Sequence, residues 1–159
     1  MGKRCRKGCK GLESITFAEN GQLNTLMPKA FSGCSSLESI TIPYGVTSIS
    51  GYLFQNCTSL TSVTLPSSVT GIGIYGFYGC SSLESITIPS GVTDIYDFAF
   101  SLCSSLVSFT CMAITPPELS YLAFVSASNQ MIIYVPNSSI DAYCSADQWS
   151  AYSTKIQGI

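Results

Sequence analysis

The residues of this chain with the widest chemical range are its eight cysteines, and five of them recur at a regular interval. Cys34, Cys57, Cys80 and Cys103 are each 23 residues apart, and Cys9 begins one more copy 25 residues earlier. If the copies stack, these cysteines form a row with Cα atoms about 4.8 Å apart. Their parallel Cβ vectors do not suit a disulfide, and a linear row does not offer the four converging ligands that zinc needs. We therefore predict buried, reduced thiols that act as weak S–H donors to turn backbone.

Three further cysteines lie outside this row, and their pairing stays open. They are Cys5, Cys111 and Cys144. Cys5 is a candidate for an exposed, reactive thiol.

Catalytic groups are scarce. The chain has no histidine, which removes Ser-His-Asp and Cys-His sites. Glu38 and Glu84 share a repeat position two copies apart, at a separation of about 9.6 Å, near that of inverting glycosidases. The same position holds Thr61 in the copy between them and Val107 in the next, which is typical of a solvated face. We predict no enzymatic activity, no cofactor and no metal site.

The cysteines belong to a repeating unit that reads C-x-x-L-x-x-I-x-I-P-x-x-V-x-x-I-x-x-x-x-F-x-x. Leu37, Leu60, Leu83 and Leu106 follow the cysteines at the same spacing. A fixed period of 20–29 residues with an L-x-x-L-x-L core indicates a leucine-rich repeat solenoid. Each copy forms one coil that stacks on its neighbours and shares their core.

One copy predicts the path of the chain in every coil. Inward Ile40 and Ile42 alternate with outward polar residues, as in a strand, and a proline ends that strand. Val46 and Ile49 line the opposite wall as a short second strand, and Phe54 closes the coil through a turn of 3₁₀ or α helix. The fold prediction is a parallel sheet of about six strands on one face, the last at 131–136, with short strands and 3₁₀/α turns on the other.

The repeat resembles the BspA-like leucine-rich repeats of bacterial and protozoan surface proteins. The resemblance covers about residues 9–136, and the tail "IIYVPNSSIDAYCSADQWSAYSTKIQGI" looks like the end of such arrays in Bacteroides-type proteins. The resemblance implies a solenoid fold, a cell-surface or secreted location for the full-length protein, and adhesion to host matrix or cell-surface proteins.

The chain divides into three predicted parts. Residues 1–8 form a basic segment that we expect to be mobile, residues 9–136 form the solenoid, and residues 137–159 form a helical C-terminal cap. The cap follows because a solenoid end exposes its core. Capping-box patterns at Ser138 and Ser145 predict two short helices. Their apolar side chains, which would cover the last coil, are Ile140, Tyr143, Trp149 and Tyr152.

Composition narrows the possible partners. The 159 residues suit one domain, and only 10% are charged, against about 25% in typical globular domains. Five of the seven basic residues lie within the first ten positions, without aromatic interleaving, so we predict no nucleic-acid binding. No run of 18 apolar residues occurs, so no membrane insertion is expected, and the basic start lacks the apolar core of a signal peptide.

The outward strand positions form two columns, which are the candidate binding surface. One column is Ser14, Ser39, Ser62, Ser85 and Ser108, and the other is Thr16, Thr41, Thr64, Thr87 and Thr110. Solenoids bind through such extended surfaces. The candidate ligand-binding residues are Glu38, Ser39, Thr41, Thr64, Glu84, Thr87 and Thr110.

Several functions remain open at this point. The first is recognition of a host extracellular-matrix protein, cell-surface protein or glycan through these columns. The alternatives are a structural spacer within a longer surface protein and, more remotely, ice or crystal-surface binding by the Ser/Thr columns. The first strand also presents an unpaired edge, so we expect self-association at the N-terminal end.

Overall fold

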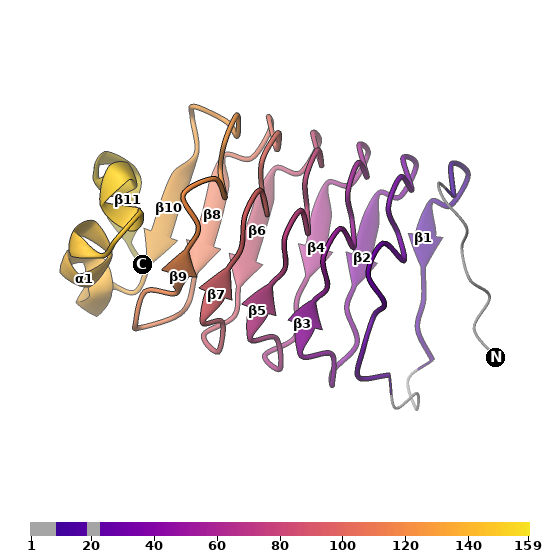
Figure 1. The fold of residues 1–159 in the computed structure, drawn as a ribbon, viewed down its shortest axis with the longest axis horizontal. Helices are drawn as coiled ribbons and strands as arrows, with labels where there is room; N and C mark the ends of the chain where they lie inside the picture. Colours follow the sequence, from indigo (N-terminus) through magenta and orange to yellow (C-terminus); the bar gives the residue numbers. More distant parts are fainter. Residues whose placement is uncertain (1–8, 19–22) are drawn as a thin grey trace.

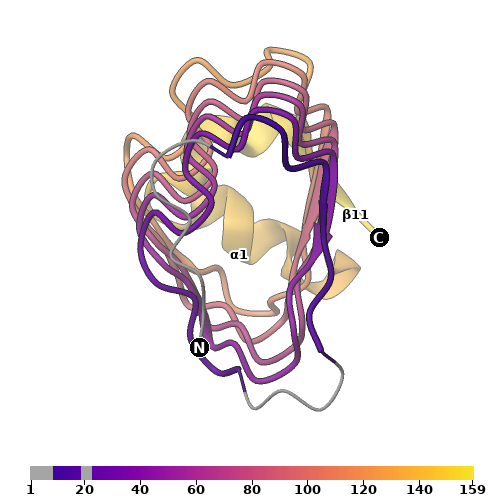
Figure 2. The same cartoon turned by 90° about the vertical axis from the view of Figure 1, so that its right-hand side faces the viewer.

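A computed structural model describes residues 9–18 and 23–159 of the protein; the predicted mobile segment 1–8 lies outside this range. The described chain is a leucine-rich repeat solenoid, in which coils stack from the N-terminal to the C-terminal end (Figure 1). Viewed along the stack, the coils lie over one another and the helical cap stands behind them (Figure 2). The 23-residue period therefore corresponds to one coil.

One wall of the solenoid consists of parallel strands, and we call its outward surface the strand face. The strands are β1 (Ser14–Ile15), β2 (Ser39–Thr41), β4 (Ser62–Thr64), β6 (Ser85–Ile88), β8 (Ser108–Cys111), β10 (Ile132–Val135) and β11 (Ile156–Gly158). They pair as two sheets, in the orders β1-β2-β4 and β11-β10-β8-β6. The six predicted repeat strands are present within the described residues, but the wall is interrupted between β4 and β6.

The opposite wall carries a second parallel sheet of two-residue strands. These are β3 (Ser48–Ile49), β5 (Gly71–Ile72), β7 (Asp94–Ile95) and β9 (Glu118–Leu119), in that order. The predicted short strand at Ile49 is confirmed. The closing segments that follow are hydrogen-bonded turns rather than the short helices expected from the sequence.

The core lies between the two walls and follows the repeat register. All the inward positions named for the second copy are buried, from Ile40 through Phe54. The closing phenylalanines form a stack through the solenoid, with ring centroids 5.3 Å apart between Phe54 and Phe77 and again between Phe77 and Phe100. The first copy is less well covered, because Ile15 and Phe17 are only partly buried.

Two columns of residues have left-handed backbone, a conformation that residues other than glycine rarely adopt. One column contains Gly33, Asn56, Gly79, Leu102 and Ser126, with φ of 57–73°. The other contains Lys29, Tyr52, Tyr75 and Phe98, with φ of 55–63°. Tyr75 stacks on Tyr52 and on Phe98, with ring centroids 4.9 and 4.8 Å apart. Stacking offsets part of the backbone strain in this second column.

Gly73 is a position where close backbone approach requires glycine. A Cβ placed there would lie 2.7 Å from the Ile49 carbonyl oxygen and 2.9 Å from the Gly51 nitrogen. We expect Gly73→Ala to lower the free energy of unfolding by about 1–3 kcal/mol, because backbone of the preceding coil must shift. Gly91→Ala is the control, since its nearest neighbours would be 3.6 Å away. Equal unfolding midpoints in urea for the two variants would contradict this packing.

The C-terminal cap consists of η1 (Asn137–Ser139), α1 (Ile140–Ser145) and η2 (Trp149–Lys155), followed by β11. Two short helical regions were predicted, but the terminal strand was not; β11 extends the strand wall by pairing with β10. The expected capping boxes are wrong. Ser145 Oγ donates to the Asp141 carbonyl instead, and Ser139, the residue before α1, makes no side-chain cap.

Tyr143 and Trp149 fix the cap to the last coils, as the sequence predicts for these two residues. Both are fully buried, with rings 5.0 Å apart in an edge-to-face arrangement. Trp149 Nε1 donates to the Pro117 carbonyl at 2.7 Å, and the Tyr143 hydroxyl donates to the Ala113 carbonyl at 2.8 Å. Both polar groups are therefore satisfied within an otherwise apolar contact.

Candidate functional site: the strand face

The strand face carries the predicted Ser and Thr columns in register. Ser39 pairs with Ser62 and Thr41 with Thr64 across β2 and β4, while Thr87 pairs with Thr110 across β6 and β8. Of the seven candidate residues, Glu38, Ser39, Thr41, Thr64, Glu84 and Thr87 are exposed and Thr110 is half-buried. The Thr column ends at Tyr134, which pairs with Thr110.

The interruption between β4 and β6 opens a pocket on this face. The Glu84 amide lies 3.5 Å from the Thr61 carbonyl, at the limit of hydrogen bonding, and no strand pairing follows it. The pocket is lined by hydroxyls that include Thr64 and Thr87, and by apolar groups that include Leu65 and Met112. Leu65, an inward position in the repeat, is only partly buried for this reason.

A second pocket lies at the equivalent place between β1 and β2, two coils away. Its lining includes Thr16, Ser39 and Thr41 on the strands and Tyr44 in the following turn. Tyr44 is 81% exposed, so its ring stands at the rim of the pocket. No charged side chain lines either pocket.

The structure therefore brings together only part of the predicted site. Ser39 and Thr41 share one pocket, and Thr64 and Thr87 share the other. Glu38, Glu84 and Thr110 line neither of them. The two pockets were not predicted, because the pattern of residues at 62–65 and 85–88 follows the repeat and contains no signal for the lost strand pairing.

The cysteine row is buried as predicted, except at its first member. Cys34, Cys57, Cys80 and Cys103 are free and buried. The sulfur of each of the last three donates to the carbonyl of a closing phenylalanine, at 3.1 Å for Cys57 and 3.2 Å for Cys80 and Cys103. The prediction that Cys9 is a reduced, buried thiol is wrong: it is disulfide-bonded and only half-buried. Cys34 is free, so this bond does not join adjacent members of the row.

Burial makes the thiols of the row weak acids. It raises the pKa of Cys57 and of Cys103 to about 12, and raises that of Cys80 as well. Thiolate is the reactive form, so we expect a thiol reagent at pH 8 to label Cys144 and none of the row in native protein. Denaturant should then release the row. Labelling of Cys57 or Cys80 without denaturant would contradict this packing.

The same pKa shift predicts how stability depends on pH. A thiol whose pKa is raised on folding keeps its stabilising effect below the unfolded value near 9, and loses it as pH rises toward about 12. The free energy of unfolding should therefore fall between these limits. The fall should be less steep in Cys57→Ala, which itself costs about 1–2 kcal/mol near neutral pH. Identical slopes for the two proteins would be inconsistent with a buried Cys57 thiol.

The described residues contain neither a group of metal ligands nor a membrane-spanning helix. Among residues 9–18 and 23–159, no three His, Cys, Asp or Glu side chains are grouped as metal ligands. Within the same residues, no helix has the length and apolar character needed to cross a membrane.

The fold and the polar strand face together define a leucine-rich repeat protein. The sequence model of the BspA type leucine rich repeat region matches residues 1–131 with six copies. The chain therefore belongs to the BspA-type leucine-rich repeat family, as its sequence suggests. No curated protein matches it.

Solved structures of bacterial leucine-rich repeat proteins are similar to it. The T. pallidum leucine-rich repeat protein TpLRR is 28% identical over 69% of this chain and 50% of its own, with a TM-score of 0.60. A leucine-rich repeat protein from Bacteroides ovatus is 25% identical over 85% of this chain and 42% of its own, with a TM-score of 0.64. The pneumococcal vaccine antigen PcpA shares the fold at 17% identity, over 94% of this chain and 40% of its own, with a TM-score of 0.71. The chain thus spans half or less of the length of these relatives.

Proposed function

We propose that this protein is a non-catalytic binding module whose strand face recognises a neutral glycan. The observation that supports this most strongly is the pair of uncharged, hydroxyl-lined pockets at equivalent positions two coils apart. Coils stack at about 4.8 Å, so the pockets repeat at about 10 Å along a straight face. A linear polymer of repeating units suits such a face better than a compact ligand does.

The lining of the pockets matches the chemistry of a sugar. Thr64 and Thr87 supply hydroxyls, each of which can both donate and accept hydrogen bonds. Leu65 and Met112 supply apolar surface for the C–H groups of a sugar ring, and Tyr44 offers an exposed aromatic ring at the other pocket. Neither pocket offers a charged side chain to pair with a strongly charged protein partner.

The support for adhesion at the cell surface is membership of the family, and the pockets themselves do not bear on it. Shallow Ser/Thr pockets predict modest affinity for each module, so useful attachment depends on many copies acting together. A surface protein built from long arrays meets that condition. The location that we propose for the full-length protein is therefore the bacterial cell surface, or secretion from the cell, with host matrix or host-cell surface as the target.

Catalysis is not part of the proposal. Glu38 and Glu84, the carboxylates that could have formed a glycosidase pair, line neither pocket. Ice binding is also disfavoured, because the Thr column is interrupted between β4 and β6 and ends at Tyr134.

The test is a binding screen of purified protein on an array of neutral and acidic host glycans and matrix proteins. The expected result is retention on neutral glycans, with stronger retention when the protein is presented in many copies on a bead. Binding to matrix proteins but not to glycans would show that the ligand is a protein and not a neutral glycan. No binding in either format would favour the alternative role of a spacer within a longer surface protein.

A further inference from the structure

A groove between the fourth and fifth coils adjoins the strand-face pocket between β4 and β6, with which it shares Ser90, and has a different chemistry. It is formed where the fifth coil departs from the repeat, at Pro116-Pro117. In the coils before it, the Thr93 amide donates to the Thr70 carbonyl and the Thr70 amide to the Thr47 carbonyl, each at 2.8 Å. The Thr70 hydroxyl donates to the same Thr47 carbonyl at 3.2 Å.

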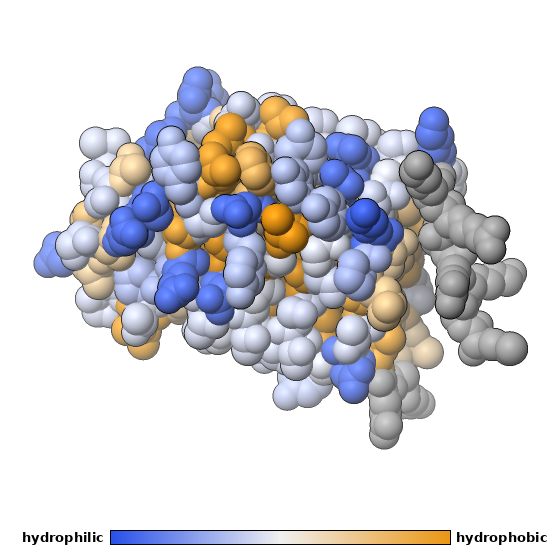
Figure 3. All heavy atoms as spheres, in the orientation of Figure 1, coloured by the Kyte–Doolittle hydropathy of each residue, from blue (hydrophilic) through white to orange (hydrophobic). Residues whose placement is uncertain are grey.

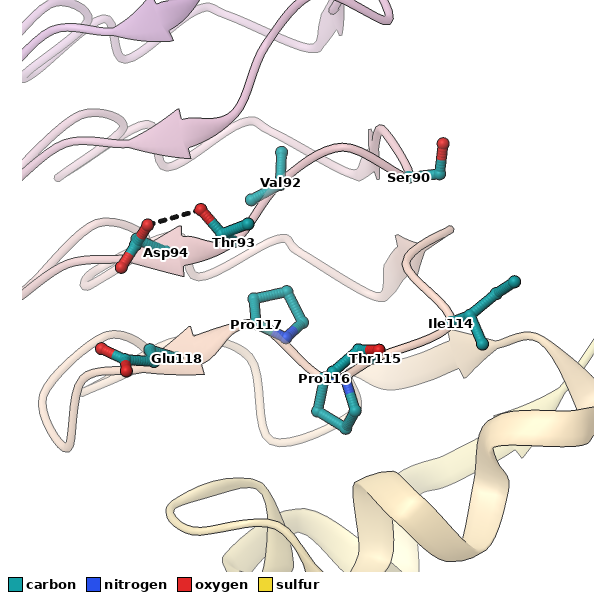
Figure 4. Close-up of a pocket in the computed structure, with 9 residues that line it drawn as sticks. All are labelled: Ser90, Val92, Thr93, Asp94, Ile114, Thr115, Pro116, Pro117 and Glu118. Carbon is teal, nitrogen blue, oxygen red and sulfur yellow. Dashed lines mark hydrogen bonds between the residues drawn. The ribbon is translucent and has the colours of Figure 1, made fainter.

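Pro117 cannot continue this ladder, because proline has no N–H and no hydroxyl. The Thr93 carbonyl accepts from the Glu118 amide instead, at 2.8 Å. The backbone of the fifth coil therefore reaches its neighbour one residue late, and an open groove remains between the two. Figure 4 shows Thr93 and Asp94 on one side of this groove and Pro116, Pro117 and Glu118 on the other.

Two carboxylates stand together at this groove. Asp94 and Glu118 are paired positions of the parallel strands β7 and β9, so their Cα atoms are about 4.8 Å apart. Asp94 accepts a hydrogen bond from Thr93 Oγ1 at 2.6 Å, which holds its side chain, whereas Glu118 is exposed. No lysine or arginine of the described chain lines the groove, so the groove itself contains no counter-charge.

The remainder of the lining mixes hydroxyl and apolar side chains, and only part of it is accessible. Ile114 is 71% exposed, and the rings of Pro116 and Pro117 form the wall beside it. A second pocket lies beyond the same prolines and includes Asp147 of the cap. The exposed side chains of Ile114 and Glu118 and the half-buried Asp94 thus lie along one opening. Elsewhere on the side of the second sheet, apolar side chains lie scattered among polar ones (Figure 3).

Because the groove holds two carboxylates and no cation among the described residues, we propose that it receives the positively charged arginine side chain of a partner protein. The planar guanidinium presents several N–H donors in a fixed fork, which suits two neighbouring carboxylates better than a lysine ammonium does. The arginine stem lies along Ile114 and Pro116, in keeping with the tendency of such stems to cover apolar surface. The second pocket, with Asp147, extends the path for a further basic residue of the same partner.

The experiment is a titration of the ¹⁵N-labelled chain with the peptide acetyl-Gly-Arg-Gly-amide, followed by amide chemical shifts. We expect saturable shifts at Thr93, Asp94, Thr115 and Glu118, with a Kd of about 1–10 mM for one exposed charge pair. Peptides with lysine or with uncharged citrulline in place of arginine should bind more weakly. The double variant Asp94→Asn/Glu118→Gln should lose the shifts, while its amide spectrum elsewhere stays as in the wild type.

The matched control removes the same charge from the strand face. Glu38→Gln/Glu84→Gln should bind the arginine peptide as the wild type does. Three results would overturn the proposal: no saturable shifts at the groove, equal affinity for the citrulline peptide, or equal loss in both double variants. Equal affinity for the lysine peptide would overturn the choice of a guanidinium. None of these outcomes bears on the strand face, because Asp94 and Glu118 do not line the pocket that contains Thr64 and Thr87.

Discussion

Replacing Phe77 by alanine is expected to lower the free energy of unfolding by about 3–5 kcal/mol, one of the largest single effects in this chain. Phe77 is fully buried and lies between Phe54 and Phe100 in the closing stack. Its loss removes ring contacts to two coils at once and leaves a cavity that their backbones cannot fill. Urea unfolding followed by circular dichroism measures the change.

Phe77→Leu is the control, because leucine keeps most of the apolar volume and should cost clearly less. If the alanine and leucine variants unfold at the same urea concentration, the stack does not support the solenoid as described. A less steep urea transition would indicate that the coils no longer unfold cooperatively.

Trp149→Ala is expected to have an effect of similar size, about 3–5 kcal/mol, through the cap instead of the coils. The substitution removes the fully buried ring that contacts Tyr143 and also deprives the Pro117 carbonyl of its donor. We expect the last coils to lose protection first, because their core is then open at the C-terminal end. Amide hydrogen exchange measures this loss of protection in β10 and β8.

Tyr152→Ala provides the comparison within the same cap. Tyr152 is only partly buried and makes one edge-to-face contact with Phe124, at 5.5 Å between ring centroids. It should therefore cost much less than Trp149→Ala. Loss of protection spread evenly over all coils in Trp149→Ala would argue against a local capping role.

The coil could be predicted from the sequence because each inward position repeats with one spacing. Leu37, Ile40, Val46 and Phe54 recur in the following copies, and a strand or turn assignment made in one coil applies to the next. The Ser and Thr columns on the strand face follow from the same register. Even the buried tyrosine and tryptophan of the cap could be predicted, since a solenoid end needs apolar cover.

The features that escaped prediction depend on contacts between coils. The missing pairing between β4 and β6 has no local signature, since both strands follow the repeat. The strand β11 depends on pairing with β10, and its one apolar side chain, Ile156, does not by itself indicate a strand. The disulfide at Cys9 could not be predicted from the spacing, because Cys9 occupies the same repeat position as the buried thiols while the first coil covers its core less completely.

The groove at Pro116-Pro117 is an intermediate case. The two prolines mark an irregular coil in the sequence, but only the structure shows that Asp94 and Glu118 face the same opening. A departure from the repeat indicates a place where neighbouring coils do not pack in the regular way. The carboxylates themselves are spaced 24 residues apart, one more than the period, so the 23-residue register does not pair them although the structure does.

The most direct test of the binding proposal is to obstruct one strand-face pocket and to measure the glycan binding of the variant. Thr64→Arg/Thr87→Arg places two bulky cations in the pocket between β4 and β6, and Thr47→Arg/Thr70→Arg adds the same groups on the opposite wall. All four threonines are exposed, so the core is unaffected. On the glycan surface that retains the wild type best, the account predicts at least about tenfold weaker binding for the first variant, or about 1.4 kcal/mol, and unchanged binding for the second. Equal binding by both variants would show that the strand face is not the site.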